Sequence, residues 1–138
     1  MEQDATTMIW IPDAKDAWLL ARVISNDEQE GTVTTLCNGT TSTFKESETF
    51  PYDASHLEYP NDLCKMNNFH DASLLHALRE RYQSDVIYTN IADVLVLINP
   101  YKLMRNLYED PLRYLVPSGV DATTAKPSDP HVYKVHIT

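Results

Sequence analysis

The residues best suited to chemistry follow an apolar stretch in the second half of the chain. The run Asp93 to Ile98 leads directly into Asn99 to Lys102, which reads Asn-Pro-Tyr-Lys, and Tyr108 follows shortly after. The Asn99 amide can donate and accept hydrogen bonds, as recognition of a purine edge requires, and Pro100 forces the chain out of the strand. A ligand site and an ordinary turn at a strand end both explain this pattern.

The histidines do not form a recognisable catalytic or metal-binding motif. His70-Asp71 with His76 has the residue types of a general base and its orienting acid, but no Ser or Cys lies in a Gly-x-Ser-x-Gly setting. His131 and His136 lack both a cysteine cluster and a His-Glu-x-x-His helix, so the sequence does not indicate a zinc site.

Glycine usage excludes the common phosphate-binding loops from these 138 residues. The chain has three glycines, and none begins Gly-x-x-x-x-Gly-Lys-[Ser/Thr] or Gly-x-Gly-x-x-Gly. The net charge of −9 argues against binding nucleic acid through phosphate neutralisation. Neither ATP hydrolysis by this chain alone nor nucleic-acid recognition is therefore indicated.

Composition predicts a folded, soluble protein. Hydrophobic residues make up 43% of the chain and charged residues 22%, close to the average for globular domains. The longest apolar run, Val94 to Ile98, is far below the roughly 20 residues that span a bilayer. Met1 to Thr7 lacks the features of a signal peptide, and Cys37 and Cys64 form no Cys-x-x-Cys, so we expect a cytoplasmic protein with reduced thiols.

The first part of the chain, residues 8–52, predicts a small β-barrel. Short β-prone runs alternate with turn residues, and Asn38-Gly39 between two Thr-rich runs predicts a hairpin. Alternation along Trp18, Leu20, Arg22 and Ile24 predicts a strand with one buried face and one face in solvent.

Two tryptophans admit two interpretations. Trp10 and Trp18 are expected in the core of the barrel, because aromatic residues usually fill the interior of small barrels. The alternative is that they line an exposed groove for a peptide.

The second part predicts a helix and two strands. Residues 53–61 form a polar connector, after which Asp71 or a neighbouring Asn caps a helix that turns Arg79, Glu80 and Arg81 toward solvent. The apolar stripe expected to be buried consists of Leu74, Leu75, Leu78 and Tyr82. Val86 to Thr89 and Asp93 to Ile98 follow as strands, the second nearly all apolar and so expected inside a sheet.

Read in order, these segments resemble the amino-terminal part of a myosin motor domain. Asn61 to Lys102 is similar to the family's Asp-Leu-x-x-Leu, Leu-x-x-Leu-x-x-Arg-Tyr, Ile-Tyr-Thr and Asn-Pro-Tyr motifs. Trp10 to Ser25 resembles the SH3-like barrel that precedes many myosin motors, and Asp129 to Tyr133 resembles a segment further along. The resemblance implies an SH3-like barrel followed by an incomplete α/β segment, the first helix and strands of the motor's central sheet.

The resemblance also implies domain boundaries: a tail at 1–7, the barrel at 8–52, a linker at 53–61 and motor core at 62–138. It further implies one wall of an adenine pocket, formed by Asn99, Pro100, Tyr101, Lys102 and Tyr108, with no catalytic residue and no metal ligand in this chain. ATP and Mg are then cofactors of the parent motor and do not bind this chain tightly.

As a myosin fragment, the chain is expected to be inactive alone, and its parent to bind actin and light chains and to associate with the cytoskeleton. No nucleic-acid or membrane partner is expected, and unpaired strands predict self-association. The alternative function is a non-catalytic interaction module built on the barrel. An autonomous enzyme using the histidines is a third hypothesis.

Overall fold

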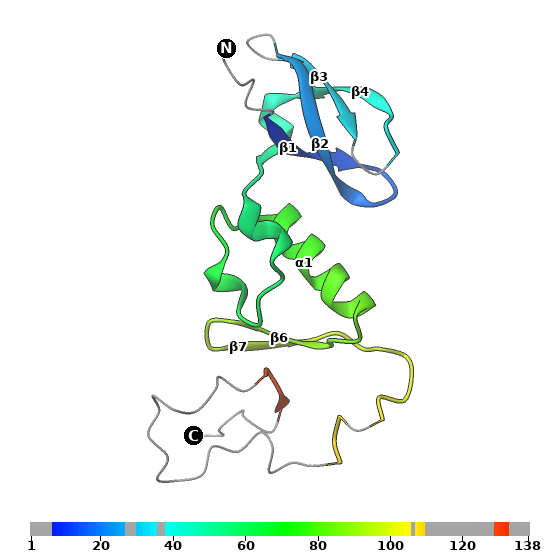
Figure 1. Ribbon diagram of the computed structural model, residues 1–138, viewed down its shortest axis with the longest axis vertical. Helices are drawn as coiled ribbons and strands as arrows, with labels where there is room; N and C mark the ends of the chain where they lie inside the picture. The colour runs from blue at the N-terminus through cyan, green and yellow to red at the C-terminus, as the bar shows by residue number, and fades with distance from the viewer. Residues whose placement is uncertain (1–6, 27–29, 36–37, 106, 110–128, 133–138) are drawn as a thin grey trace. The chain divides into compact units, whose positions relative to one another are not determined.

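The computed structural model describes residues 7–26, 30–35, 38–105, 107–109 and 129–132 (Figure 1). It divides into two compact units, Met1–Glu58 with Asn67–His76, and Tyr59–Met66 with Ala77–Thr138. No helix among the described residues is long and apolar enough to cross a membrane.

The first unit is built on an antiparallel five-stranded sheet in the order β4-β3-β2-β1-β5. Its strands are β1 (Met8–Asp13), β2 (Ala17–Asn26), β3 (Glu30–Thr35), β4 (Thr41–Lys45) and β5 (Phe50–Pro51), with a 3-10 helix, η1 (Glu46–Glu48), before β5. The hairpin predicted from Asn38-Gly39 is confirmed, since β3 and β4 pair with Thr34 opposite Thr41. The turn spans more than two residues, and Gly39 adopts a φ of 68°.

The core of this sheet comes from one face of its strands. Four buried side chains form its centre, and three half-buried ones pack around them: Ile11, Ala21, Val33 and Phe44, with Ile9, Leu19 and Val23. The prediction that β2 has one buried and one solvent-exposed face is confirmed, because Ala21 is fully buried whereas Arg22 and Ile24 are exposed. The buried face carries Leu19, Ala21 and Val23. The apolar residues on both faces of β2 concealed which one faces the core.

The tryptophans lie outside this core. Trp10 is 1% exposed, as predicted, but it alternates with Ile9 and Ile11 and therefore leaves β1 on the opposite face. Its ring contacts His56 and His76 instead of the barrel interior. Trp18 is half-buried against Phe50, at 5.0 Å between ring centroids, so its expected place in the core was wrong.

Two further 3-10 helices lie between β5 and α1. In the first unit, η2 (Ala54–Leu57) is capped by Asp53, whose carboxylate accepts the Ser55 N–H. In the second, η3 (Leu63–Lys65) is capped by Asp62. The segment 53–61 thus contains an ordered helical turn, and the boundaries given for it above remain a proposal.

The helix α1 (Asp71–Gln83) differs from its prediction at its start. Its cap is His70, not Asp71: Nδ1 of His70 accepts the Ser73 N–H at 3.2 Å, and the His70 N–H donates to Ser73 Oγ at 3.0 Å. An imidazole nitrogen replaces the carboxylate oxygen expected of a cap, with the reciprocal pattern of a capping box.

The buried stripe of α1 also differs from its prediction. The buried side chains are Ala72, Ser73, Ala77 and Arg81, whereas Leu74, Leu78 and Tyr82 are half-buried and Leu75 is 37% exposed. Arg81, expected in solvent, is only 6% exposed. Small residues here permit close packing, and the arginine finds polar partners.

The second unit contains an antiparallel pair, β6 (Tyr88–Ile91) and β7 (Val94–Leu97), with Tyr88 opposite Leu97. Tyr88 and Thr89 are buried, but Val94 and Leu97 are 62% and 56% exposed. The expectation that the second strand lies inside a sheet was therefore wrong for this structure, since β7 pairs only with β6 among the described residues. Because Val94 and Leu97 are three residues apart, exposed apolar side chains lie on both faces of β7.

Two sequence predictions concern residues outside those described, Cys37 and His136. Cys64 is described, and its thiol is free and exposed.

Candidate functional site

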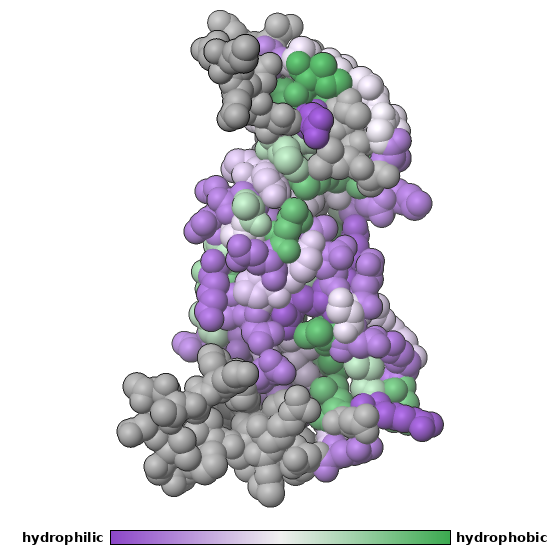
Figure 2. Space-filling model, in the orientation of Figure 1, coloured by the Kyte–Doolittle hydropathy of each residue, from purple (hydrophilic) through white to green (hydrophobic). Residues whose placement is uncertain are grey.

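A cavity of about 360 Å³ lies in the second unit, beside the segment that follows β7. Its lining combines four apolar side chains with four of the five predicted site residues: Ile87, Leu97, Leu103 and Met104, and Asn99, Pro100, Lys102 and Tyr108. At the lower right of Figure 2, where this segment runs in Figure 1, hydrophobic surface lies beside hydrophilic surface. The volume and the mixture of an apolar lining with a few polar groups are typical of small-molecule sites.

Tyr101, the fifth predicted residue, is not part of this cavity. Its side chain is 89% exposed, and its backbone has a φ of 50°. The turn that follows Asn99 causes this orientation, because Asn99 Oδ1 accepts the Tyr101 N–H at 2.9 Å. The sequence could not reveal which of two adjacent side chains the turn would direct outward.

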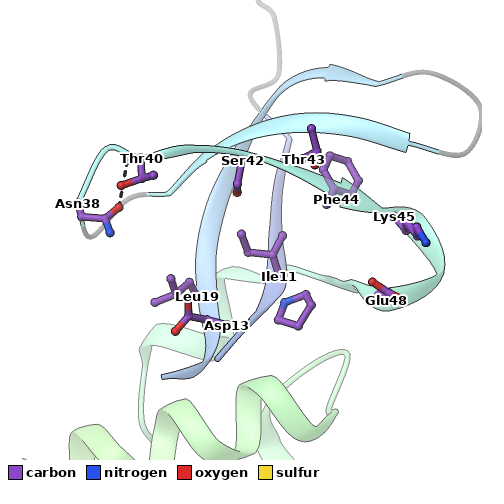
Figure 3. A pocket seen from close by; sticks show the side chains of 11 residues that line it. Ile11, Asp13, Leu19, Asn38, Thr40, Ser42, Thr43, Phe44, Lys45 and Glu48 are labelled. Carbon is purple, nitrogen blue, oxygen red and sulfur yellow. Dashed lines mark hydrogen bonds between the residues drawn. The ribbon is translucent and has the colours of Figure 1, made fainter. Parts of the chain in front are cut away.

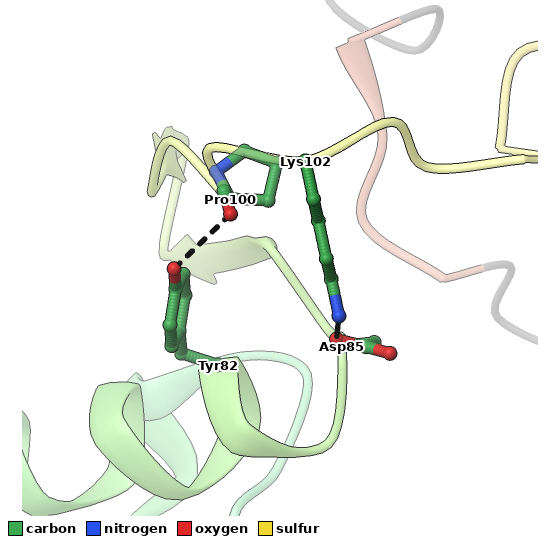
Figure 4. A network of polar contacts seen from close by, with 4 residues as sticks. All are labelled: Tyr82, Asp85, Pro100 and Lys102. Atoms are coloured by element: carbon green, nitrogen blue, oxygen red, sulfur yellow. Dashed lines mark hydrogen bonds and ion pairs between the residues drawn. The ribbon is translucent and has the colours of Figure 1, made fainter.

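Two contacts attach Pro100 and Lys102 to the end of α1 (Figure 4). The Tyr82 hydroxyl donates to the Pro100 carbonyl at 3.3 Å, and the Lys102 ammonium forms an ion pair with Asp85. Both charged side chains are more than half exposed, so the ion pair contributes little stability. Its effect is to direct the lysine along the cavity wall.

The turn also fixes what Asn99 can offer to a ligand. Its side-chain oxygen accepts from the backbone, and its amide nitrogen is therefore the atom with which it can donate to a ligand. A ring nitrogen with a free lone pair, which every purine carries, is a suitable acceptor.

Tyr108 is positioned by two buried residues that the sequence did not single out for this role. Its hydroxyl lies 2.8 Å from the Tyr88 hydroxyl, and its ring meets the His131 ring edge-on at 5.4 Å between centroids. His131 is 1% exposed, and its Nε2 lies 3.0 Å from the Leu107 carbonyl oxygen. The quoted motifs contained Tyr88 and His131, but no local pattern predicts that distant residues meet.

A second cavity of about 360 Å³ shares Ile87 and Met104 with the first. Asn61, Asp85 and Asp129 contribute polar groups to it, and Asn61 donates to Asp129 at 3.1 Å. Asn61 also accepts from the buried Arg81 guanidinium. Burial lowers the pKa of Arg81, and the nearby Asp129 carboxylate opposes that shift. An arginine nevertheless stays protonated in proteins.

In the first unit, a third cavity of similar volume opens on the barrel between β1 and β4 (Figure 3). Ile11, Leu19 and Phe44 form its apolar lining, and Asp13 lies at its edge with Lys45 and Glu48. Backbone N–H groups of Asp16 and Lys15 donate to Asp13 and lower the pKa of its carboxyl group. Among the described residues that line this cavity, Phe44 is the one aromatic side chain.

The histidines of the first unit do not form a catalytic pair. Both ring nitrogens of His70 bond to backbone groups, Nδ1 to Ser73 N–H and Nε2 to the Pro51 carbonyl at 3.0 Å. Neither nitrogen is available to abstract a substrate proton. Among the described residues, no three histidine, cysteine or acidic side chains lie close enough together to bind a metal ion.

Comparison with known proteins relates both units to one family. Residues 1–53 match the family model described as the myosin N-terminal SH3-like domain, and residues 60–136 match the one described as the myosin head (motor domain). The predicted fold class, an SH3-like barrel followed by a partial α/β segment, is confirmed.

Individual relatives cover most of the chain. Myosin-13 of Arabidopsis thaliana is 31% identical over 109 residues, which are 75% of this chain and 7% of that protein. Myosin-M heavy chain of Dictyostelium discoideum is 29% identical over 131 residues, 94% of this chain and 7% of that protein. Myosin-1 of Saccharomyces cerevisiae is 27% identical over 148 residues, 93% of this chain and 8% of that protein. The chain thus spans less than a tenth of these relatives' length.

Proposed function

The chain belongs to the myosin family, and on that premise we propose that it is the amino-terminal part of an ATP-driven motor that moves on actin. Residues 99–108 contribute one wall of the adenine pocket. The observation that carries this proposal is the cavity after β7, which has Asn99, Pro100, Lys102 and Tyr108 in its lining. These four residues line one cavity, and its size suits a small molecule.

The lining suits a base better than a phosphate chain. Leu97, Leu103 and Met104 provide apolar surface, the Tyr108 ring provides a flat face, and the Asn99 amide provides a donor. Among the described residues, no carboxylate that could hold Mg²⁺ lines the cavity, and no phosphate-binding loop occurs in the sequence of 138 residues. Positioning and charge stabilisation supply most of the catalysis in phosphoryl transfer, so the chain alone is expected not to hydrolyse ATP.

Actin and light chains are proposed as partners of the whole motor, through parts outside these residues, with a cytoplasmic location on the cytoskeleton. For the chain itself we propose self-association through β7. Its Val94 and Leu97 side chains are more than half exposed, and an apolar strand edge favours pairing with another strand.

Amide NMR spectra of the 138-residue chain, titrated with adenosine, ATP and ATP with Mg²⁺, test the adenine wall. We expect weak binding, with dissociation constants on the order of millimolar, because the contacts of one wall are few. Adenosine and ATP should bind about equally, and Mg²⁺ should not tighten binding. Signals of Ile87, Leu97 and Asn99 should shift, whereas signals of the barrel should not.

Matched tyrosine variants serve as the control. Tyr108→Ala removes a lining ring and should abolish the adenosine-induced shifts, whereas Tyr101→Ala removes an exposed ring and should leave them unchanged. Shifts confined to other regions, or micromolar binding that requires Mg²⁺, would contradict the proposed wall.

The alternative, an interaction module, retains one supporting observation, the cavity on the barrel with its Ile11, Leu19 and Phe44 lining. Burial of Trp10 counts against the aromatic groove on which that hypothesis first depended. A chain carrying Phe44→Ala that loses a binding partner, while its adenosine response is unchanged, would favour the module.

A further inference from the structure

In the first unit, a cluster of aromatic and imidazole rings includes Trp10, which lies on the face of β1 opposite the barrel core. We name it the ring cluster; its members are Trp10, Trp18, Phe50, His56 and His70. Phe50 of β5 stacks on His70 at 4.4 Å between centroids with a 9° interplanar angle. His70 in turn meets His56 edge-on at 5.0 Å. The cluster packs β5 against the residues that start α1.

His56 supplies the fixed part of the cluster. Its ring is fully buried, and its Nδ1 accepts from Trp10 Nε1–H at 3.1 Å, while its Nε2 lies 2.8 Å from the Asn67 carbonyl oxygen. Since a carbonyl accepts, Nε2 carries the proton and Nδ1 does not. The ring therefore links β1 to the segment before α1.

His70 has the same tautomer by the same argument. Its Nε2–H donates to the Pro51 carbonyl of β5, and its Nδ1 accepts the Ser73 N–H of α1. Unlike His56, this ring is only half-buried, so protons from solvent can reach it. A second proton, on Nδ1, would direct the new N–H of the ring at the Ser73 N–H. The Ser73 amide would then lose its acceptor. The bond to Pro51 would survive, because the imidazolium still donates from Nε2.

We propose that His70 is a proton-operated cap of α1. The neutral ring joins the first turn of the helix to β5, and the protonated ring stays bound to β5 but releases that turn. An added positive charge at the start of a helix is also disfavoured by the helix dipole, whose positive end lies there.

The charged and titratable neighbours favour the neutral ring on balance. Desolvation lowers the pKa of His70 below its ordinary 6.5, and the neighbouring His56 acts in the same direction. The bond to Pro51 and the Asp71 carboxylate of α1 oppose this shift. The Asp53 backbone N–H donates to Nδ1 of His56, and the Tyr52 ring meets the His56 ring edge-on. A folded-state pKa below 6.5 means that the unfolded turn binds more protons, so the cap is weakened as the pH falls below 6.5.

Hydrogen exchange of the Ser73 amide in the 138-residue chain, measured between about pH 8 and pH 5, tests the cap. The protection factor should fall below pH 6.5, by up to about tenfold per pH unit until the folded-state pKa is reached. The amide of Val33 in the barrel core should keep its protection. Imidazole nitrogen shifts of His70, followed in the same samples, should report Nε2–H at high pH and a midpoint below 6.5.

Two variants separate the cap from general acid sensitivity. His70→Asn keeps a side-chain oxygen that can cap the helix but does not titrate, and should make Ser73 protection independent of pH. His76→Gln removes another histidine of the same unit and should leave the pH profile unchanged. The proposal is overturned if His70 titrates at or above 6.5, or if it titrates without change at Ser73. Should His70→Asn not fold, the imidazole shifts of the unmodified chain still decide.

Discussion

Replacing Arg81 by methionine should strongly destabilise the second unit. The guanidinium makes four hydrogen bonds: Nε to Thr89 Oγ1 at 2.9 Å, Nη1 to the Tyr59 carbonyl at 2.9 Å, and Nη2 to Asn61 Oδ1 and the Tyr88 carbonyl at 3.0 Å each. It thereby joins α1 to β6 and to the segment before η3. Methionine retains the apolar stem but none of these donors.

The magnitude follows from which acceptors lie away from water. Thr89 and Tyr88 are 1% and 4% exposed, whereas Asn61 is exposed and Tyr59 is half-buried, so water can replace the donor at the latter two. An orphaned buried acceptor costs about 1 to 3 kcal/mol, which gives about 2 to 6 kcal/mol for the pair. That loss is comparable to the whole stability of many small domains, about 5 to 15 kcal/mol.

Urea denaturation of the 138-residue chain, followed by the amide signal of Thr89, measures this loss in the second unit alone. Arg79→Met is the matched control on the same helix, and should cost less than about 1 kcal/mol, as is usual for partly exposed charges. The periodicity of the sequence instead directs Arg81 to solvent, where its replacement would change the stability by at most about 0.5 kcal/mol. Equal, small effects of the two replacements would refute the buried network.

Three further predictions concern the barrel, the ring cluster and η3. Gly31→Ala should destabilise the barrel by about 1 to 3 kcal/mol in thermal melts, because a Cβ there would lie 2.5 Å from the Phe44 ring. Trp10→Phe should lower the melting temperature and remove the donor to His56 Nδ1, which the imidazole nitrogen shifts will report; unchanged shifts would contradict that bond. Backbone N–H donors lower the pKa of Asp62 below its ordinary 3.8, so the stability that this carboxylate contributes is present above that pH and lost as the pH falls below it. Asp62→Asn should therefore reduce the loss of stability below pH 3.8, measured by denaturation at a series of pH values.

Local signals predicted the parts of the fold whose geometry is decided locally. Asn38-Gly39 identified a hairpin because few residues tolerate the backbone of such a turn. The motif order from Asn61 to Lys102 identified the family. Pro100 predicted a strand end close to the observed one, since β7 ends at Leu97, three residues earlier.

Two of the failures, at Arg81 and His70, involve residues that have partners far away in the chain. Helical spacing places Arg81 in solvent, whereas its guanidinium donates to Thr89 and to the Tyr59 carbonyl. His70 was an unexpected cap because imidazole is rarely counted among capping groups, and its second partner belongs to β5. Helical spacing ranks apolar residues, and it gives no weight to a polar side chain that tertiary contacts bury.

The candidate site was partly accessible from sequence. The resemblance supplied Asn99, Pro100, Lys102 and Tyr108, which the structure brings to one cavity. It also supplied Tyr101, which the turn directs away, and it gave no role to Tyr88 and His131, which position Tyr108. Distinguishing lining from non-lining residues needs the backbone path of the turn.

The central claim, that these residues work as part of an ATP-driven motor, is tested most directly by sequencing the transcript across the codon of Thr138. The account predicts an open reading frame that continues into a Gly-x-x-x-x-Gly-Lys-[Ser/Thr] loop, since the proposed adenine wall requires a phosphate site to bind ATP. A stop codon directly after Thr138 in every transcript would contradict it.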